Sequence, residues 1–369
     1  MRFSLFRAQL GYGDRLQVFT ASSGPVPALE ELYLRVDWPG GVAWAEARAN
    51  IAYASGVPAE AVPGLAHDAA RAAAVAGCTD PDALLAHLDA TRAPHPIARN
   101  LLECAALEGL ARSQGVAVAA LLGGGEGGVR PVESNQCIFA GDTLERAASR
   151  AAAYAAEGFR RIKVRVGVGT AAEDTDRLRA IRAAVGDDVH LAVDANGTWS
   201  VAETVERLRA LDGLGVEYCE QPTPPGDWTA FAEAASRTGW ALMADEGLRT
   251  EADHDALRRI GPPHLAHLKL PKSGGPRPLV RQARALAEAG IRCMVGQMNE
   301  GALATAAALH CALAARPALA ELYGAYGLLN DPAQGLRYRD GAAAVEEPVG
   351  VGVRLDPGRL TPVWSVGEA

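Results

Sequence analysis

The sequence is poor in aromatic residues and has no excess of positive charge. Of its 369 residues 5% are aromatic, and 44 acidic side chains against 36 lysines and arginines give a net charge of −8. Nucleic-acid binding needs clustered lysine and arginine that release counterions from phosphate. The pairs Arg160-Arg161 and Arg258-Arg259 are isolated and are interpreted as solvated surface charge. We therefore expect no nucleic-acid partner.

Paired cysteines and long apolar runs are also missing. The six cysteines are scattered and contain no CxxC pair, which argues against a zinc ribbon or a disulfide framework and favours reduced thiols. The first apolar stretch is too short and too interrupted by charge for a signal peptide, and no run of about 18 apolar residues follows. We expect a cytoplasmic protein without a membrane partner.

The first third of the chain predicts an α+β capping domain at residues 1–125. Residues 29–47 hold two apolar runs on either side of Pro39-Gly40-Gly41, the pattern of a β-hairpin. Three stretches of helical periodicity follow, at residues 66–77, 80–90 and 97–112.

A glycine-rich stretch, GGGEGGVRPV at 123–132, separates this domain from the rest. It lacks the Lys-Ser/Thr ending of a phosphate-binding loop and is interpreted as a linker. We place a barrel domain with a metal site at residues 126–340. The segment 341–369 is expected to return to the capping domain.

Short β-branched runs alternate with helical runs beyond the linker, as in parallel β/α units. Eight strand candidates lie at residues 134–140, 160–166, 189–195, 216–221, 240–246, 264–270, 291–297 and 319–324. Helical stretches begin near residues 143, 171, 200, 227, 250, 275 and 301. The α/β pattern favours a closed (β/α)8-type barrel over an open doubly wound sheet, although a variant with seven strands or seven helices also fits. No GxGxxG supports a dinucleotide fold.

Charged residues end several of these strands, one β/α unit apart. Asp194, Glu220 and Asp245 are separated by 26 and 25 residues, and Lys269 follows 24 residues later. The carboxyl ends of barrel strands converge on one mouth, where active sites lie. Three converging carboxylates repel one another unless a cation lies between them. Oxygen ligands favour Mg²⁺ or Mn²⁺ over Zn²⁺, so these three acids are the predicted metal ligands.

Each of these acids could alternatively cap the helix that follows it, as aspartate in βα loops often does. Three acids in register argue against that alternative. Lys269 interrupts a run expected to be buried on both faces, and burial beside a cation would lower its pKa and make it a usable base. Lys272, in the next loop, is interpreted more readily as a surface lysine.

These motifs resemble the enolase superfamily and, within it, the muconate-lactonizing enzyme subgroup. The resemblance runs through GGVAWAEA, ARNLLECAALEGLARSQGVAVAALLGG, KVR, VDAN, EQP, ADE and LKLPKSGGPR. It implies that the three acids bind a metal, normally Mg²⁺, and that Lys269 is the acid/base lysine of the sixth strand, a pairing typical of this superfamily. It also implies removal of a proton beside the carboxylate of a small substrate, with the resulting enolate stabilised by the metal and cationic side chains.

The resemblance assigns roles to further residues. It implies that Lys163 neutralises the substrate carboxylate and that Glu300 is the acidic catalytic residue after the seventh strand. The loops 12–23 and 50–55 resemble those that close over the substrate. The predicted substrate-binding residues are Tyr12, Asn50, Tyr53, Gln297, Glu321 and Tyr323. By analogy with the family, we expect a homo-oligomer, a dimer or an octamer.

Arg165 occupies a position where this subgroup usually has a second lysine. Arginine cannot give up its proton in a protein, so two-base racemisation is harder to support. We favour one-base chemistry from Lys269, either cycloisomerisation or the β-elimination of an acid-sugar dehydratase, over a racemase or epimerase. The segment 271–277 resembles the cycloisomerase branch. Remoter alternatives are a metal-free Schiff-base enzyme that uses Lys269 or Lys163, and a non-catalytic binding protein.

Overall fold

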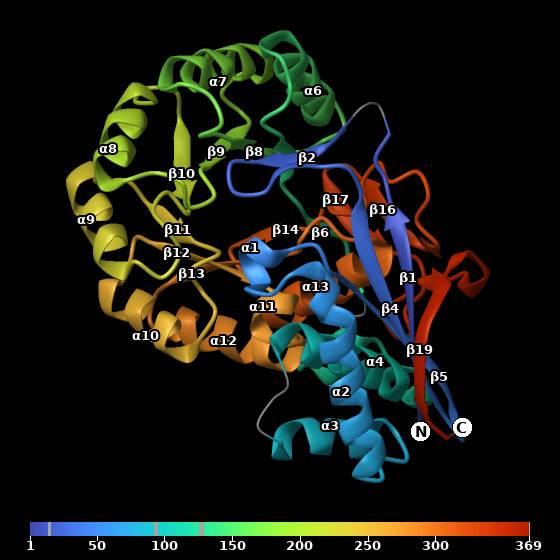
Figure 1. Cartoon of the computed structure of the whole chain (residues 1–369). Coiled ribbons are helices and arrows are strands. Elements are labelled where there is room, and N and C mark those ends of the chain that lie inside the picture. The colour runs from blue at the N-terminus through green and yellow to red at the C-terminus, as the bar shows by residue number, and fades with distance from the viewer. Residues whose placement is uncertain (14–15, 92–94, 125–128, 369) are drawn as a thin grey trace.

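The computed structural model of the chain describes residues 1–13, 16–91, 95–124 and 129–368. The centre of the predicted linker, residues 125–128, lies outside the described residues. Figure 1 shows a ring of strands surrounded by helices, with the N-terminal strands and helices packed at one side of that ring. Within the described part of the chain, no helix is both long and apolar enough to cross a membrane.

The N-terminal region contains a four-stranded antiparallel sheet in the order β19-β1-β4-β5. The predicted hairpin is confirmed, because β4 (Leu29–Trp38) pairs with β5 (Gly41–Arg48) across a short turn. β1 (Arg2–Leu10) lies between β4 and β19 (Thr361–Gly367). The two ends of the described chain therefore meet in one sheet, as Figure 1 also shows.

Helix α4 (Pro96–Gln114) links this sheet to the barrel. It begins with a proline, whose missing N–H would have no partner there, and Gly115 ends it in the left-handed conformation. Its residues are buried on nearly every face, because it packs between β5 and the one-turn barrel helix α11 (Leu270–Ser273). The other elements of this region are β2 (Val18–Thr20), β3 (Gly24–Val26), α1 (Ala52–Ser55), η1 (Ala59–Ala61), α2 (Val62–Val75), α3 (Pro81–Ala90) and α5 (Val118–Leu121).

Eight parallel strands form a nearly closed barrel, as predicted. They are β7 (Gln136–Ile138), β8 (Arg161–Arg165), β9 (His190–Asp194), β10 (Val216–Glu220), β11 (Leu242–Ala244), β12 (Leu265–Lys269), β13 (Arg292–Gly296) and β14 (Leu319–Glu321). The long helices between them are α6 (Leu144–Ala156), α7 (Ala171–Val185), α8 (Val201–Ala210), α9 (Trp228–Thr238), α10 (Glu251–Ile260), α12 (Pro276–Glu288) and α13 (Ala302–Ala315). The N–H of Asn135, beside β7, donates to the carbonyl of Ala320 in β14 at 3.0 Å and brings the first and last strands together.

Small strands, rather than a long helix, follow β14 in residues 322–368, all of which the structure describes. They are β15 (Ala333–Gln334), β16 (Leu336–Arg339), β17 (Ala342–Val345) and β18 (Arg354–Leu355). β17 also pairs with β6 (Val132–Glu133). The short helix η2 (Pro357–Arg359) precedes β19. The barrel thus has eight strands and seven connecting long helices, and the alternative with seven strands is wrong.

The barrel interior is layered along the strands. Residues two apart in a strand point to the same side, so an interior position repeats every second residue. One interior layer is apolar and consists of Ala192, Tyr218, Met243, Leu265, Met294 and Leu319. The residue two positions after each member of this apolar layer is also buried. These residues are Asp194, Glu220, Asp245, His267, Gly296 and Glu321. At this level charged and polar groups, which we call the polar layer, replace the apolar core.

Candidate metal and acid/base site

The three predicted metal ligands all lie in the polar layer. Asp194 ends β9, Glu220 ends β10 in register with Asp194, and Asp245 directly follows β11. Their side chains are at most 3% exposed. The helices that follow are capped by other residues, Ser200, Asp227 and Thr250. The helix-capping alternative is therefore wrong for all three acids.

Lys163 in β8 binds acids on three strands. Its Nζ lies 2.6 Å from Glu321 Oε2, 2.9 Å from Glu220 Oε2 and 3.4 Å from Asp194 Oδ2. Burial lowers the pKa of Lys163, but the Glu220 and Glu321 carboxylates outweigh burial and raise it well above its usual value. Burial would raise the pKa of Glu321, yet Lys163 holds it below the usual value. Lys163 therefore stays charged.

Arg165 ends β8 and lies inside the site. It pairs in register with Asp194, and its guanidinium donates to Asp194 Oδ2. The residue is 5% exposed. Burial raises the pKa of Asp194 to about 6, although the Arg165 charge opposes the rise. Arg165 thus clamps the first carboxylate and, being arginine, supplies no proton.

Lys269 and Lys272 contact the third carboxylate from the opposite side. Lys269 Nζ lies 2.6 Å from Asp245 Oδ2, and Lys272 Nζ lies 2.5 Å from Asp245 Oδ1. Lys272 also donates to the carbonyl of His267 at 3.0 Å. Its side chain is 2% exposed, so the interpretation of Lys272 as a surface lysine is wrong.

The charges on this side depend on one another. Burial would raise the pKa of Asp245, but Lys269 and Lys272 hold it well below its usual value. Burial likewise lowers the pKa of Lys269, yet the nearby carboxylates, Asp245 foremost, raise it above its usual value. The lowered pKa expected for Lys269 beside a cation therefore requires a bound cation that neutralises these carboxylates.

The donor set fits a hard divalent cation. Ligand atoms of Glu220, Asp245 and His267 lie within 4.8 Å of one another, the only such group found among the described residues. Asp194 adjoins them through Lys163, which contacts both Asp194 and Glu220. Several buried carboxylate oxygens in one place suit Mg²⁺ or Mn²⁺. The lysines and Arg165 place further positive charge beside these acids.

His267 in β12 is a site residue that the sequence analysis missed. Its Nδ1 lies 2.9 Å from Glu220 Oε1, and its Nε2 lies 3.8 Å from Glu321 Oε1. A signal for it was present in the sequence, because His267 precedes Lys269 by two residues and alternate residues of a strand face the same side.

Glu321 and Tyr323 lie on the Lys163 side of the barrel. The Glu321 carboxylate accepts from Lys163 and, at 3.0 Å, from Asn135 Nδ2. Tyr323 is buried in a small cluster that includes Cys137 of β7 and Val18 of β2. The N-terminal region thus covers this side of the mouth. Their predicted role in substrate binding stays a prediction.

Gln297 and Glu300 belong to the loop between β13 and α13. The Glu300 carboxylate accepts from the backbone N–H groups of Met298 at 3.1 Å and Arg48 at 3.4 Å, which ties the loop to β5. Gln297 Oε1 accepts from the backbone N–H of Asn299. Within the described residues, neither side chain hydrogen-bonds to a lysine of the site.

Tyr12 and Tyr53 connect the N-terminal region to the barrel mouth. The Tyr12 hydroxyl donates to the carbonyl of Gly324 at 2.6 Å, and the Tyr53 carbonyl accepts from Arg249 at 2.6 Å. Asn50 acts within the N-terminal region, where its side chain accepts from Arg48 Nε at 2.6 Å and donates to a backbone carbonyl at 2.9 Å. Their contacts with substrate stay predictions.

The PKSGGPR segment docks the barrel against α4. Gly275 has a φ of +125°, and a Cβ at this position would lie 2.8 Å from Glu103 Oε1. The backbone N–H of Arg277 donates to the same oxygen at 2.8 Å, and the Arg277 guanidinium lies 2.8 Å from Asp89. These contacts explain the glycine and arginine of the motif by domain docking, whereas its lysine, Lys272, belongs to the site.

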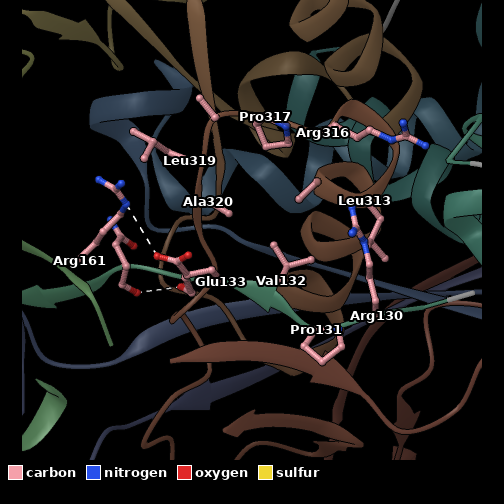
Figure 2. Close-up of a pocket in the computed structure, with 14 residues that line it drawn as sticks. Arg130, Pro131, Val132, Glu133, Arg161, Leu313, Arg316, Pro317, Leu319 and Ala320 are labelled. Carbon is pink, nitrogen blue, oxygen red and sulfur yellow. Dashed lines mark hydrogen bonds and ion pairs between the residues drawn. The ribbon is translucent and has the colours of Figure 1, made fainter. Parts of the chain in front are cut away.

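A cavity of about 320 Å³ lies at the opposite end of the barrel. Its lining includes Arg161, Leu319 and Ala320, at the amino-terminal ends of β8 and β14 (Figure 2). Figure 2 shows Arg161 directed toward Glu133, with the charged atoms 3.8 Å apart. Active sites of parallel barrels lie at the carboxyl ends of the strands, so this cavity is separate from the candidate site.

The fold and the polar layer define a parallel β/α-barrel protein whose buried carboxylates gather at the end of the barrel where active sites of this fold lie. Residues 146–359 match the family described as enolase C-terminal domain-like, so the chain belongs to this family. The predicted membership of the enolase superfamily is confirmed, and a muconate cycloisomerase is among the relatives.

Three relatives illustrate the range of this family. The chain is 36% identical to the N-succinyl-L-Arg/Lys racemase of Bacillus cereus over 169 residues, which is 46% of each chain, so this match spans about half of that relative. It is 29% identical to muconate cycloisomerase 1 of Pseudomonas putida over 286 residues, 76% of this chain and 75% of the relative. The substrate-liganded L-Ala-D/L-Glu epimerase of Bacillus subtilis superposes with a TM-score of 0.85 and 25% identity, covering 96% of this chain and 98% of that one.

Proposed function

We propose that this protein is a Mg²⁺-dependent isomerase that moves a proton at the carbon next to the carboxylate of a small substrate, with Lys269 as acid and base. The observation that carries the proposal is the position of Lys269. It lies at the end of β12, 4% exposed, 2.6 Å from Asp245 and on the opposite side of the carboxylates from Lys163. The named relatives, a racemase, a cycloisomerase and an epimerase, support an isomerase.

The residues divide the work as follows. Asp194, Glu220 and Asp245 would hold the ion, which when bound polarises the substrate carboxylate and stabilises the charge left by proton removal. Lys269 takes the proton from the carbon in one direction and returns it in the other. The N-terminal region packs over one side of the mouth through an apolar cluster and would limit the access of water to this exchange.

The opposite side of the site supports one-base chemistry. Arg165 keeps its proton by its own chemistry. Lys163 contacts Glu321 at 2.6 Å, a carboxylate that is not a proposed ligand and would continue to hold the proton when the ion neutralises Asp194 and Glu220. Both groups therefore act as fixed positive charge near the substrate carboxylate. This asymmetry favours cycloisomerisation over racemisation, and an elimination from the Lys269 side uses the same groups.

A racemase or epimerase of an amino-acid derivative is the second candidate. The similarity to the racemase of Bacillus cereus and to the epimerase of Bacillus subtilis favours it. It needs a second proton carrier opposite Lys269, and Lys163 is the candidate there. Lys163 would have to exchange its bonds to Glu220 and Glu321 for a contact with substrate.

Proton exchange in D₂O tests the proposal across several classes of carboxylate substrate at once. The panel contains muconates, N-succinyl amino acids, dipeptides, proline derivatives and acid sugars, each followed by proton NMR with Mg²⁺ present. We expect one class to exchange the proton beside its carboxylate or to isomerise. Chelation with EDTA should stop the reaction, and added Mg²⁺ should restore it.

Three outcomes point to other functions. Activity that survives EDTA, together with covalent trapping of a carbonyl substrate by borohydride, identifies a Schiff-base enzyme that uses Lys269 or Lys163. Binding of metal without exchange or turnover across the panel points to a binding protein. Exchange that converts either configuration of the substrate into an equal mixture of both identifies a racemase and contradicts the one-base proposal.

A further inference from the structure

His267 lies among the proposed metal ligands but is not one of the three acids, so its role in the site has still to be explained. It is fully buried in the polar layer, between Asp245, which follows β11, and Gly296 on β13. A Cβ at residue 296 would overlap the His267 ring, so the glycine leaves the space that the imidazole fills. An imidazole in a layer of acids is costly to bury unless its nitrogens have partners.

His267 lies between the two glutamates that Lys163 also contacts, and it is hydrogen-bonded to Glu220 but too far from Glu321 for a hydrogen bond. His267 Nδ1 lies 2.9 Å from Glu220 Oε1, whereas Lys163 Nζ lies 2.9 Å from Glu220 Oε2. His267 Nε2 faces Glu321 Oε1 at 3.8 Å, and Lys163 Nζ lies 2.6 Å from Glu321 Oε2. The imidazole and the ammonium group therefore alternate with two carboxylates around the barrel axis.

This arrangement determines what the imidazole does. A carboxylate oxygen only accepts hydrogen bonds, so the Nδ1 of His267 must donate to Glu220. Nδ1 carries the donated proton and therefore has no lone pair for a metal. It also lies 3.9 Å from Asp245 Oδ2, too far for a hydrogen bond to that second acid. Nε2, which has the lone pair in the neutral ring, faces Glu321 and Gly296 rather than the proposed ligands.

We propose that His267 is a positioning residue of the metal site, which fixes the Glu220 carboxylate by donating from Nδ1 to Oε1 while Lys163 holds the other oxygen. The inference rests on the proposed function, in which Glu220 binds the ion. With both oxygens held, Glu220 keeps one orientation, and its remaining lone pairs are available to a cation. Outer partners of this kind preorganise ligands and strengthen metal binding.

Mn²⁺ binding followed by electron paramagnetic resonance tests this role without an activity measurement. We expect His267→Ala to weaken Mn²⁺ binding by roughly 10- to 100-fold. His267→Asn places an amide N–H near the position of Nδ1 and should recover most of the affinity. His267→Gln reaches toward the position of Nε2 and should recover less. Thermal unfolding of each variant in EDTA checks that the barrel is folded.

His264 provides the matched control. It is also a buried histidine, directly before β12, and accepts from the backbone N–H of Leu242 at 3.2 Å. His264→Ala should lower thermal stability and leave the Mn²⁺ dissociation constant unchanged. Equal loss of Mn²⁺ affinity in His264→Ala and His267→Ala would mean that any buried cavity weakens the site, and would overturn the positioning role.

Three further results separate this inference from the proposed function. A wild-type protein that binds no Mn²⁺ contradicts the proposed metal site itself. If the wild type binds Mn²⁺ and His267→Ala binds it as tightly, only the role of His267 is wrong. Echo-modulation spectra that reveal a nitrogen coordinated to Mn²⁺, and lost in His267→Ala, would make His267 a ligand and overturn the positioning role.

Discussion

The two sides of the polar layer hold their cations in different ways. On the β8 side, Lys163 contacts three carboxylates, and Arg165 is bonded to Asp194. On the β12 side, Lys269 contacts Asp245, which Lys272 also binds. Lys163 contacts Glu321, which is not one of the proposed ligands, and would keep this carboxylate if an ion neutralised Glu220 and Asp194. Lys269 contacts only the proposed ligand Asp245 among its described salt-bridge partners, so a bound ion would remove more of what holds its proton.

This difference separates two tasks that a proton-transfer site must combine. In the proposed function, the β8 side provides constant positive charge, which compensates buried acids and a substrate carboxylate. The β12 side would provide the group that exchanges a proton. The same residue types would therefore act differently because of the acids around each one.

The largest expected effect comes from removing the exchangeable group. In Lys269→Ala, proton exchange with the best substrate of the panel should fall by roughly 10²- to 10⁴-fold, the usual contribution of a positioned acid or base. NMR in D₂O measures it. Mn²⁺ affinity should remain near the wild-type value, because Lys269 is not a ligand. Near-wild-type exchange in this variant would remove Lys269 from the mechanism.

Removing the fixed charge should instead affect the fold. Lys163→Met leaves Glu220 and Glu321 buried without their common cation, and we expect the free energy of unfolding to drop by about 3–5 kcal/mol. Urea denaturation in EDTA measures the drop. Lys269→Met should cost clearly less, because Asp245 keeps Lys272. Equal losses in the two variants would show that the two sides do not differ in this way.

The loss of activity at low pH is a further test of the polar layer. Before it is measured, the acid sensitivity of stability that comes from a residue outside the site should be removed. Burial lowers the pKa of His310 in α13 from 6.5 to about 4. Its Nδ1 accepts from the backbone N–H of Ala119, so the folded protein holds the ring neutral. Between those pH values the unfolded chain binds the proton and the folded chain does not, and stability falls as the pH falls.

His310→Gln should remove this sensitivity, since the amide oxygen can accept the same bond and does not titrate. Linkage gives a difference in acid-induced destabilisation of roughly 3 kcal/mol between pH 7 and pH 4. Urea denaturation across this range measures it. The acid dependence that remains in this background includes the polar layer and also His95, His254 and His264, whose pKa burial likewise lowers. A wild-type-like acid profile would mean that His310 is protonated in the folded state.

Much of the fold was predictable because its signals are local. Each long barrel helix begins at the predicted residue or one later. For three of them the local signal is a capping box at Thr170, Ser200 and Thr250. The three carboxylates were predictable as well. Their spacing is that of one β/α unit, and parallel strands bring residues at their carboxyl ends together.

The parts that were missed depend on contacts distant in sequence. Lys272 is buried only because α11 turns it toward Asp245. For His267 the sequence offered its spacing from Lys269, but its contact with Glu220 joins residues 47 positions apart. The hydrogen-bond partners of the Tyr12 and Asn50 side chains depend on how the N-terminal region packs. No local pattern specifies which of them hydrogen-bonds to the barrel and which within its own sheet.

The smallest expected effect on rate, and the sharpest test of the comparison, comes from Arg165→Lys. A lysine at this position retains the charge beside Asp194 and gains the ability to release a proton. It also loses the planar fork of arginine, so we expect turnover to change by no more than about tenfold. The informative change is stereochemical: deuterium should enter from the second face, and the recovered substrate should lose its configuration. Proton NMR combined with chiral chromatography measures both.

The outcome depends on which residue limits the β8 side. If Arg165 restricts the reaction to one face, wild-type protein keeps the configuration and the variant scrambles it. If wild-type protein already racemises the substrate, Lys163 must leave Glu321 to act as the second base, and the fixed charge inferred for this side is wrong. If neither protein scrambles the configuration, the three acids around Lys163, rather than the arginine, keep the β8 side from exchanging protons.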